Sequence, residues 1–319
     1  MKDLRTEDEI IANWKGDIDK PVVSICCITY NHEPYIEDAL KGFLIQETDF
    51  PFEILIHDDA STDRTADIIR EYEAKYPRLI KPIYQVENQY SQGVKISPKF
   101  NYPRAKGEYI AICEGDDYWI DKDKLQKQYD FLKLNQEYSL CFHSAKIINE
   151  QDNFHFRGES IENREYSGQE ILAEWTIPTA SVMFVNNEAI KNILIINLHN
   201  KSYMYGDIII FLTLVEFGKL RGLKDVMSVY RRHPGGITKK HVGVLKLKEF
   251  IKHHEEISSN FNGAYVSTEK KILSRLYFVL AIHQILKIDI RFMISLLKSL
   301  NKNPQVFIKS FKDYLVRLF

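Results

Sequence analysis

Continuous apolar runs that alternate with helical patterns constrain the fold of this chain more than any other feature. The first run, "PVVSICCIT" (21–29), is β-branched and apolar on both faces, which is typical of a strand buried in a parallel sheet. A segment with helical spacing follows at 33–47, and further strands are expected at 52–57, 78–85, 107–112 and 138–148. Strand and helix units of this length predict an α/β fold with an open, mostly parallel central sheet flanked by helices.

The pattern changes after about Asn149. One more strand is expected at 177–185, a helix at 206–218, and a strand at 226–238 that runs into a Pro-Gly-Gly loop. From Val244 onward the chain reads as helical. Residues 242–319 carry thirteen Lys and Arg against six Asp and Glu, whereas the whole chain has a net charge of -1. We therefore expect a catalytic domain over 1–240 and a basic helical region over 241–319.

The composition is that of a soluble globular protein, with 45% apolar and 27% charged residues among 319. The nearly neutral net charge gives no indication of nucleic-acid binding. The first twenty residues are polar and lack the apolar stretch of a secretion signal. The longest apolar stretch, 276–286, is too short to span a bilayer. With four cysteines that lack metal-ligand spacing, these features predict a cytoplasmic protein with reduced core thiols.

Polar side chains follow three of the expected strands where each strand ends. They are Tyr30 and Asn31, Asp58 and Asp59, and the run "CEGDDYW" (113–119). In open α/β sheets, ligands bind at the carboxyl ends of the strands. These three segments therefore predict one binding site at that edge of the sheet.

The run from Glu114 to Asp117 places three carboxylates within four positions, and like charges in contact repel one another. Such a cluster is either a solvated turn or a cation site. The chain has no glycine-rich phosphate-binding loop after the first strand and no P-loop. A nucleotide-binding sheet without that loop needs another partner for the diphosphate. Mg²⁺ or Mn²⁺ held by carboxylates would serve, because both ions bind carboxylate and phosphate oxygens together.

Four segments together resemble family 2 glycosyltransferases, which have the GT-A fold. They are "VSICCITYNHEPYIEDAL", "FEILIHDDASTDRT", "AKGEYIAICEGDDYW" and "YGDIIIFLTLVEFG", and the resemblance covers about residues 20–240. It implies an inverting transferase that uses a nucleotide-diphosphate sugar with Mg²⁺ or Mn²⁺. The run "EGDD" stands where the family has its D-x-D motif, with Glu114 in place of the usual first Asp.

The resemblance also implies roles for individual residues. Tyr30 and Asn31 would contact the nucleoside, and Asp59 would accept a hydrogen bond from a uracil ring. Asp116 and Asp117 would bind the ribose and the metal, and the sequence does not decide which residue binds which. Glu114 is a weaker candidate. Asp207 resembles the catalytic base at the start of a late helix. A favourable charge at a helix start is the alternative interpretation for Asp207.

Basic contacts are expected in two further segments. "YRRHPGG" resembles a loop that closes on the diphosphate, with Arg232 and His233 as contacts. The family often has an Ala-Arg-Asn segment before "GEYI", whereas this chain has "SPKFNYPRAKG". The basic nucleotide contact there would be Lys99 or Arg104, or neither.

The expected function is transfer of a sugar, most simply from a UDP-sugar, to a hydroxyl of a glycan or lipid-linked acceptor in cell-surface polysaccharide synthesis. Two alternative functions belong to other classes of protein. A sugar-phosphate nucleotidylyltransferase would normally carry a glycine-rich loop after the first strand, and "ITYNHEPY" has no glycine. A non-catalytic module with the transferase fold would have no reason to keep Asp59, Asp116, Asp117 and Asp207 together.

The basic tail allows two interpretations. In the terminal stretch, Val306, Phe307, Phe311, Leu315 and Leu318 can share an apolar face beside Lys309, Lys312 and Arg317. Such a helix either packs on the catalytic domain or a second subunit, which would give a homodimer, or lies peripherally on the inner face of an anionic membrane.

Overall fold

The structure is a computed structural model that describes residues 4–150, 154–157, 161–174, 177–200, 202–236, 244–261, 263–286 and 291–318. The chain forms two compact units. The first consists of Met1–Ser167, Thr176–His199 and Ile209–His233, and the second of Gly168–Trp175, Asn200–Ile208 and Pro234–Phe319.

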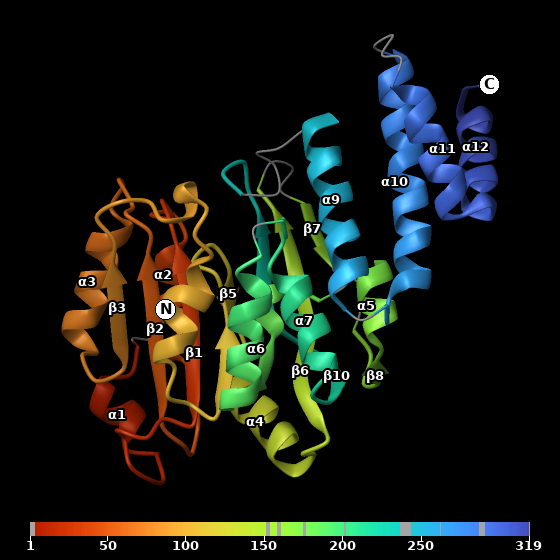
Figure 1. Ribbon diagram of the computed structural model, residues 1–319. Coiled ribbons are helices and arrows are strands. Elements are labelled where there is room, and N and C mark those ends of the chain that lie inside the picture. The colour runs from red at the N-terminus through yellow and green to blue at the C-terminus, as the bar shows by residue number, and fades with distance from the viewer. Residues whose placement is uncertain are drawn as a thin grey trace. The chain divides into compact units, whose positions relative to one another are not determined.

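The first unit is built on one sheet, which has ten strands within the described residues (Figure 1). Eight of them follow one another across the sheet in the order β3 (Ile80–Tyr84), β2 (Phe52–Asp58), β1 (Val23–Thr29), β4 (Tyr109–Ile112), β9 (Met183–Val185), β6 (Tyr138–Asn149), β10 (Lys219–Arg232) and β5 (Tyr118–Trp119). Strand β7 (Phe154–Arg157) pairs with β6, and β8 (Glu165–Tyr166) pairs with β10.

The strand directions confirm the predicted α/β sheet and add detail to it. Strands β3, β2, β1 and β4 run parallel, as the apolar runs predict. All seven residues of β2 are buried, as are six of the seven in β1, which is why neither strand shows polar alternation. Beyond β4 the sheet becomes mixed, because β9 is antiparallel to both β4 and β6, whereas β10 is parallel to β6.

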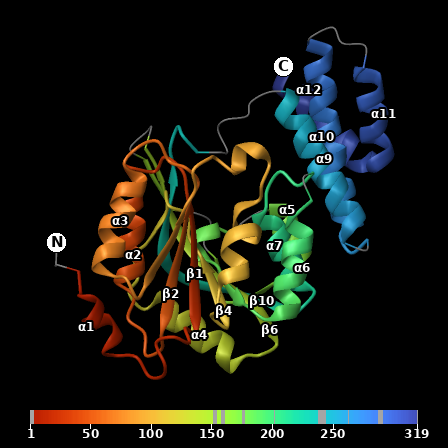
Figure 2. The same cartoon turned by 60° about the vertical axis from the view of Figure 1, so that its left-hand side comes forward.

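Helices cover both faces of this sheet. Figure 2 shows α2 (Ile36–Leu44) and α3 (Thr65–Lys75) on one face and α6 (Glu188–Leu198) on the other. The helix α4 (Lys124–Leu134) packs on β6 and β9, and the short α1 (Glu7–Ile11) precedes the sheet. The helix α2 approaches β5 so closely that a Cβ on Gly42 would lie 2.8 Å from the backbone nitrogen of Trp119. The helix α7 (Asp207–Val215) confirms the helix predicted at 206–218. Its first two residues belong to the second unit and the others to the first.

The second unit is helical, as the sequence predicts from Val244 onward. Its helices are α5 (Gly168–Glu174), α9 (Val244–Asn260), α10 (Val266–Leu286), α11 (Phe292–Lys302) and α12 (Pro304–Leu318). The long α10 contacts each of the other four helices. The rings of Phe278 on α10 and Phe307 on α12 have centroids 5.8 Å apart, so the terminal helix packs on α10. Among the described residues, no helix has the length and apolar character needed to cross a membrane.

The four cysteines are buried and free, as the sequence predicts. A less expected core residue is Lys124, at the start of α4, which is fully buried. Its Nζ donates to Gln128 Oε1 at 2.7 Å and lies 3.9 Å from the centroid of the Trp119 ring. Burial lowers the pKa of Lys124 to about 7, because the charged ammonium loses its hydration.

This lysine should make the stability of the protein depend on pH. The unfolded chain keeps a proton on Lys124 up to its ordinary pKa, whereas the folded chain releases it above about pH 7, so stability must rise with pH in that interval. Between pH 7 and pH 9 we expect the free energy of unfolding of the wild type to rise by about 2 kcal/mol more than that of Lys124→Met, measured by urea denaturation.

Lys106→Met is the matched control, because Lys106 is exposed and its variant should keep the wild-type pH dependence. If the free energy of unfolding changed equally with pH in the wild type and in Lys124→Met, the folded protein would hold Lys124 in its charged form, against this expectation.

Candidate active site

The loops that follow β1, β2 and β4 lie at the same edge of the sheet. Strand β1 pairs in parallel with β2 on one side and β4 on the other, and Thr29 at the end of β1 is level with Asp58 at the end of β2. Residue Tyr30 follows β1, Asp59 follows β2, and the 114–117 run follows β4. The parallel pairing therefore brings the three predicted segments to one edge.

The loops after β1 and β2 are bonded to each other through Asn31. Its backbone N–H donates to Ser61 Oγ at 2.9 Å, and its Oδ1 accepts from the backbone N–H of Thr62 at 2.8 Å. Asn31 and Ala60 both have left-handed backbones, with φ of 54° and 62°, which costs energy for residues with a Cβ. The helix α3 starts at Thr65, and Ser61 and Thr62 in the loop before it bond to Asp58 and Asn31.

Asp59 organises a turn at residues 89–90 that no local sequence pattern indicates. Its side chain is buried, Oδ1 accepts from the backbone N–H of Gln89 at 2.8 Å, and Oδ2 accepts from that of Tyr90 at 2.9 Å. Each carboxylate oxygen has a second lone pair, so Asp59 can still accept a bond from a ligand. The neighbouring rings of Tyr30 and Tyr90 are 38% and 50% exposed, which leaves aromatic surface for a ligand at this edge.

The carboxylates of Glu114, Asp116 and Asp117 form one cluster, with an oxygen of each within 4.8 Å of the others. A Cβ on Gly115 would lie 2.7 Å from Thr29 Oγ1, so only glycine fits where this turn crosses the end of β1. The sequence-based expectation that like charges gather here is confirmed by this geometry.

The two aspartates have different electrostatic surroundings. Burial, followed by the neighbouring charge of Asp116, raises the pKa of Asp117 well above its usual value. Burial acts on Asp116 in the same direction, but the hydrogen bond from His233 and the charges of His32 and His233 hold its pKa below the usual value. Asp116 Oδ2 lies 3.0 Å from His233 Nε2 and 3.8 Å from His32 Nε2.

One oxygen of each aspartate is suited to a cation. Asp116 Oδ1 and Asp117 Oδ2 are buried and make no hydrogen bond within the described part of the chain, and buried polar atoms in that state are costly. Hard carboxylate oxygens are the ligands that Mg²⁺ and Mn²⁺ prefer. These residues therefore fit a divalent cation, with Glu114 as a third carboxylate.

Arg231 holds the aspartates in place, and sequence reasoning missed it. Its backbone N–H donates to Asp117 Oδ1 at 2.8 Å, and its Nη1 donates to the carbonyl oxygen of Asp116 at 3.0 Å. The guanidinium also pairs with Asp38 and lies 4.3 Å from the centroid of the Tyr118 ring. These bonds fix both the backbone and one carboxylate of the pair.

The strand geometry of β10 explains why Arg231 and not Arg232 reaches the cluster. Successive side chains of a strand point to opposite faces, so "YRRH" can direct only one of its two arginines there. Arg232 is exposed, and its carbonyl oxygen accepts from Glu150 N–H. The predicted contact His233 does reach the cluster, at Asp116. His32 was also missed, although it directly follows the Tyr30-Asn31 pair.

The segment before β4 uses its basic residues structurally. Arg104 donates to the carbonyl oxygens of Lys81 at 2.7 Å and Ile56 at 2.9 Å, and so holds the segment on β3 and β2. Lys99 Nζ lies 5.0 Å from the centroid of the Phe100 ring, which stacks on His57. A nucleotide contact by Lys99 or Arg104 stays a prediction. Asp207 begins α7, and its Oδ1 accepts from Ile208 N–H at 2.9 Å; its role as a base also stays a prediction.

Comparison with known proteins gives a family match over this region. The family model described as Glycosyl transferase family 2 matches residues 24–194. An uncharacterized protein of Mycobacterium tuberculosis is 39% identical over 216 residues, which are 67% of this chain and 60% of that protein. The chain thus spans about 60% of the length of that relative.

Two further relatives have descriptive names. The putative teichuronic acid biosynthesis glycosyltransferase TuaG of Bacillus subtilis is 38% identical over 122 residues, covering 38% of this chain and 44% of TuaG. The UDP-Glc:alpha-D-GlcNAc-diphosphoundecaprenol beta-1,3-glucosyltransferase WfaP of Escherichia coli is 28% identical over 239 residues, covering 75% and 86%.

Solved structures share the fold. S. aureus TarS 1-349 in complex with UDP has a TM-score of 0.61 at 18% identity and covers 90% of this chain and 82% of its own. The mannosyltransferase PcManGT from Pyrobaculum calidifontis, in complex with GDP-Man and Mn2+, has a TM-score of 0.57 at 16% identity and covers 94% and 81%. These likenesses confirm the predicted fold class.

Proposed function

Because the chain belongs to glycosyl transferase family 2, we propose that it transfers a sugar from a nucleotide-diphosphate sugar to an acceptor hydroxyl with inversion. A UDP-sugar is the proposed donor, and the proposed acceptor is a glycan or a lipid-linked glycan of a cell-surface polysaccharide. The observation that carries the proposal is the pair of half-buried Asp116 and buried Asp117, which has one buried, unbonded oxygen on each residue at the carboxyl edge of the sheet.

The names of similar proteins support the choice of donor and acceptor. TarS structures contain UDP or UDP-GlcNAc, and the name of WfaP specifies a UDP-Glc donor and a diphosphoundecaprenol-linked acceptor. PcManGT contains GDP-Man with Mn2+, which supports a divalent cation. Uridine is proposed for this chain because Asp59 is placed to accept a hydrogen bond and a uracil ring has an N–H to donate.

In the proposed site, the nucleoside lies against Tyr30 and Asn31, with its base hydrogen-bonded to Asp59. Asp116 and Asp117 hold ribose and a Mg²⁺ or Mn²⁺ ion, with Glu114 as a further carboxylate. When bound, such an ion supplies positive charge that stabilises the leaving diphosphate. Arg231 keeps the aspartates oriented, and His233 beside Asp116 is proposed to contact the diphosphate, whereas Arg232 lies on the other face of β10.

The proposed chemistry is a single displacement. An acceptor hydroxyl is a poor nucleophile until a base takes its proton, and Asp207 is proposed to accept that proton. The acceptor oxygen then bonds to the anomeric carbon while the bond from that carbon to the diphosphate oxygen breaks. General-base assistance of this kind contributes about 10²–10⁴ in rate. One displacement on the carbon inverts its configuration.

Hydrolysis of a panel of nucleotide sugars tests this proposal without knowledge of the acceptor. UDP-, GDP- and dTDP-sugars are incubated with the protein in Mn²⁺ and, separately, in EDTA. We expect slow, Mn²⁺-dependent release of UDP from at least one uridine donor, because water can replace the acceptor hydroxyl. In a parallel assay with added pyrophosphate, formation of nucleoside triphosphate and sugar 1-phosphate would favour a nucleotidylyltransferase instead. The absence of turnover with every donor would favour a non-catalytic module.

A further inference from the structure

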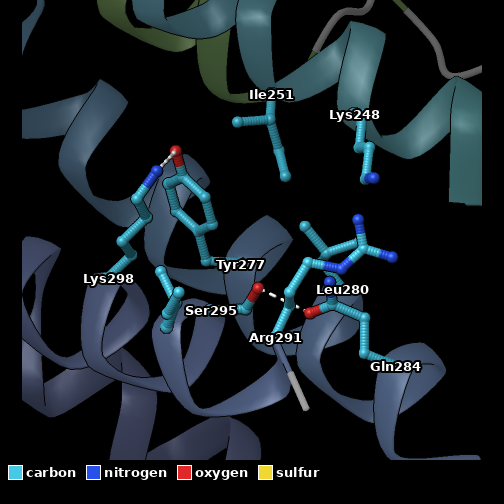
Figure 3. A pocket seen from close by; sticks show the side chains of 9 residues that line it. Lys248, Ile251, Tyr277, Leu280, Gln284, Arg291, Ser295 and Lys298 are labelled. Atoms are coloured by element: carbon cyan, nitrogen blue, oxygen red, sulfur yellow. Dashed lines mark hydrogen bonds between the residues drawn. The ribbon is translucent and has the colours of Figure 1, made fainter. Parts of the chain in front are cut away.

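The second compact unit contains a cavity of about 270 Å³ between α9, α10 and α11. Its inner wall is apolar and is formed by Ile251 from α9 together with Leu280 and the ring of Tyr277 from α10, all of which are buried. Figure 3 shows these side chains around the space, with Ser295 and Gln284 hydrogen-bonded to each other beside it at 2.6 Å. None of these residues belongs to the carboxylate site.

Three cationic side chains also line this cavity: Lys248 from α9, Arg291 just before α11, and Lys298 within α11. Figure 3 shows the charged ends of Lys248 and Arg291 directed at each other. Lys298 Nζ lies 3.5 Å from the hydroxyl of Tyr277, which itself donates to Glu255 Oε1. None of the ion pairs between described residues involves Lys248 or Lys298.

Like charges that converge on one cavity repel one another unless an anion lies between them. Arg291 offers several N–H donors in a planar arrangement that matches phosphate oxygens. The cavity also lies beside the start of α11, where backbone N–H groups favour negative charge. A phosphate group fits this chemistry.

The exposed face of α11 indicates what carries the phosphate. Met293, Ile294, Leu297 and Leu300 are 54%, 58%, 55% and 37% exposed, and their spacing places them on one side of the helix. Ile294 also lines the cavity, so the apolar stripe and the cations meet there. Lysine and arginine beside an apolar face are the arrangement by which a helix lies in the interface of an anionic membrane.

We propose that this cavity binds the phosphate headgroup of an anionic membrane lipid, with the α11 stripe (Met293, Ile294, Leu297 and Leu300) in contact with the acyl region. The inference concerns membrane attachment, and it does not depend on the transfer reaction because lipid binding needs no nucleotide sugar. It places the membrane contact on α11 and the cavity, whereas the sequence suggested the terminal helix α12.

Vesicle co-sedimentation of the full chain tests this proposal. The wild type should bind phosphatidylglycerol-containing vesicles at low salt and not phosphatidylcholine vesicles. The pocket variant Lys248→Ala/Lys298→Ala should bind about 30-fold more weakly, since each cation near an anionic surface contributes about 1 kcal/mol. The control variant Lys270→Ala/Lys271→Ala removes the same charge from exposed positions of α10 and should lose at most a few-fold. Circular dichroism verifies that both variants are folded.

Two further measurements distinguish binding of a lipid phosphate from binding of soluble phosphate. Leu297→Gln keeps every cation, and it should weaken vesicle binding by about 10-fold because less apolar surface is buried in the membrane. Inorganic phosphate at concentrations that match the lipid should not displace the protein. The proposal would be overturned if the pocket and control variants lost vesicle binding equally, or if the wild type did not bind anionic vesicles. It would also be overturned if the protein bound phosphate without binding vesicles and Leu297→Gln left that phosphate binding unchanged.

Discussion

Replacing Asp117 with asparagine should lower the rate of nucleotide-sugar turnover by at least about 10², because the proposed cation at the leaving diphosphate would lose a ligand. The folded protein should survive the change. Burial raises the pKa of Asp117, so the ionised carboxylate is unfavourable in the metal-free fold, whereas the amide oxygen can still accept the 2.8 Å bond from Arg231 N–H. We therefore expect a Tm in EDTA equal to or above that of the wild type.

Asp123→Asn is a matched control, since Asp123 lies before α4 and its side chain makes no capping hydrogen bond there. The control should turn over at the wild-type rate. Near-normal turnover by Asp117→Asn, measured with saturating Mn²⁺ and the donor found in the hydrolysis panel, would remove Asp117 from the proposed metal site.

Replacing Asp207 with asparagine should lower kcat by about 10² or more while donor affinity stays close to that of the wild type. The amide has nearly the same size as the carboxylate and can keep the local bond to Ile208 N–H, but it cannot accept the proton of the acceptor hydroxyl. The measurement is kcat for transfer together with the Kd for the nucleoside diphosphate.

Glu188→Gln controls for the other role that an acid has at a helix start. Glu188 is an exposed acid in the first turn of α6, and an acid there stabilises a helix by about 0.3–1 kcal/mol. Its variant should change stability slightly and kcat not at all. If Asp207→Asn changes donor binding and leaves kcat intact, Asp207 is a binding residue and the base must be sought elsewhere.

The strands and the position of the site could be predicted because they depend on local patterns. Runs such as β1 and β2 are buried on both faces, so their sequences are continuously apolar. Parallel strands place their following loops at one edge, and this brought Asn31, Asp59 and Asp117 together as predicted. The helices α5 and α6 were not predicted, although α6 carries apolar residues at helical spacing such as Ile190, Leu194 and Leu198.

The parts of the site that escaped prediction depend on contacts between distant segments. Arg231 is distinguished from Arg232 only by the side of β10 on which it lies, and that follows from the pairing of β10 with β5. The bonds from Asp59 to the 89–90 backbone join residues about thirty positions apart. The burial of Lys124 likewise follows from packing against Trp119 and Gln128, which no local pattern indicates.

The terminal helix α12 shows that an amphipathic pattern also depends on contacts that the sequence does not reveal. The sequence assigned Phe307 and Phe311 to one apolar face, but a pattern does not say what covers that face. In the structure Phe307 packs on Phe278 of α10, whereas the stripe on α11 is exposed. A homodimer through these helices and a location at the inner membrane face stay predictions, and the vesicle experiment addresses the second.

Asp116 and Asp117 are proposed to hold a divalent cation that binds the diphosphate of a nucleotide donor. Calorimetric titration of UDP into the wild type and into Asp117→Asn, each in Mn²⁺ and in EDTA, tests this proposal most directly. We predict that Mn²⁺ tightens UDP binding to the wild type by at least about 10-fold, since charge neutralisation of this kind contributes more than about 1.4 kcal/mol, and that it has no effect on the variant. Equal UDP affinity of the wild type in Mn²⁺ and in EDTA, or the same Mn²⁺ enhancement in Asp117→Asn, would contradict the account.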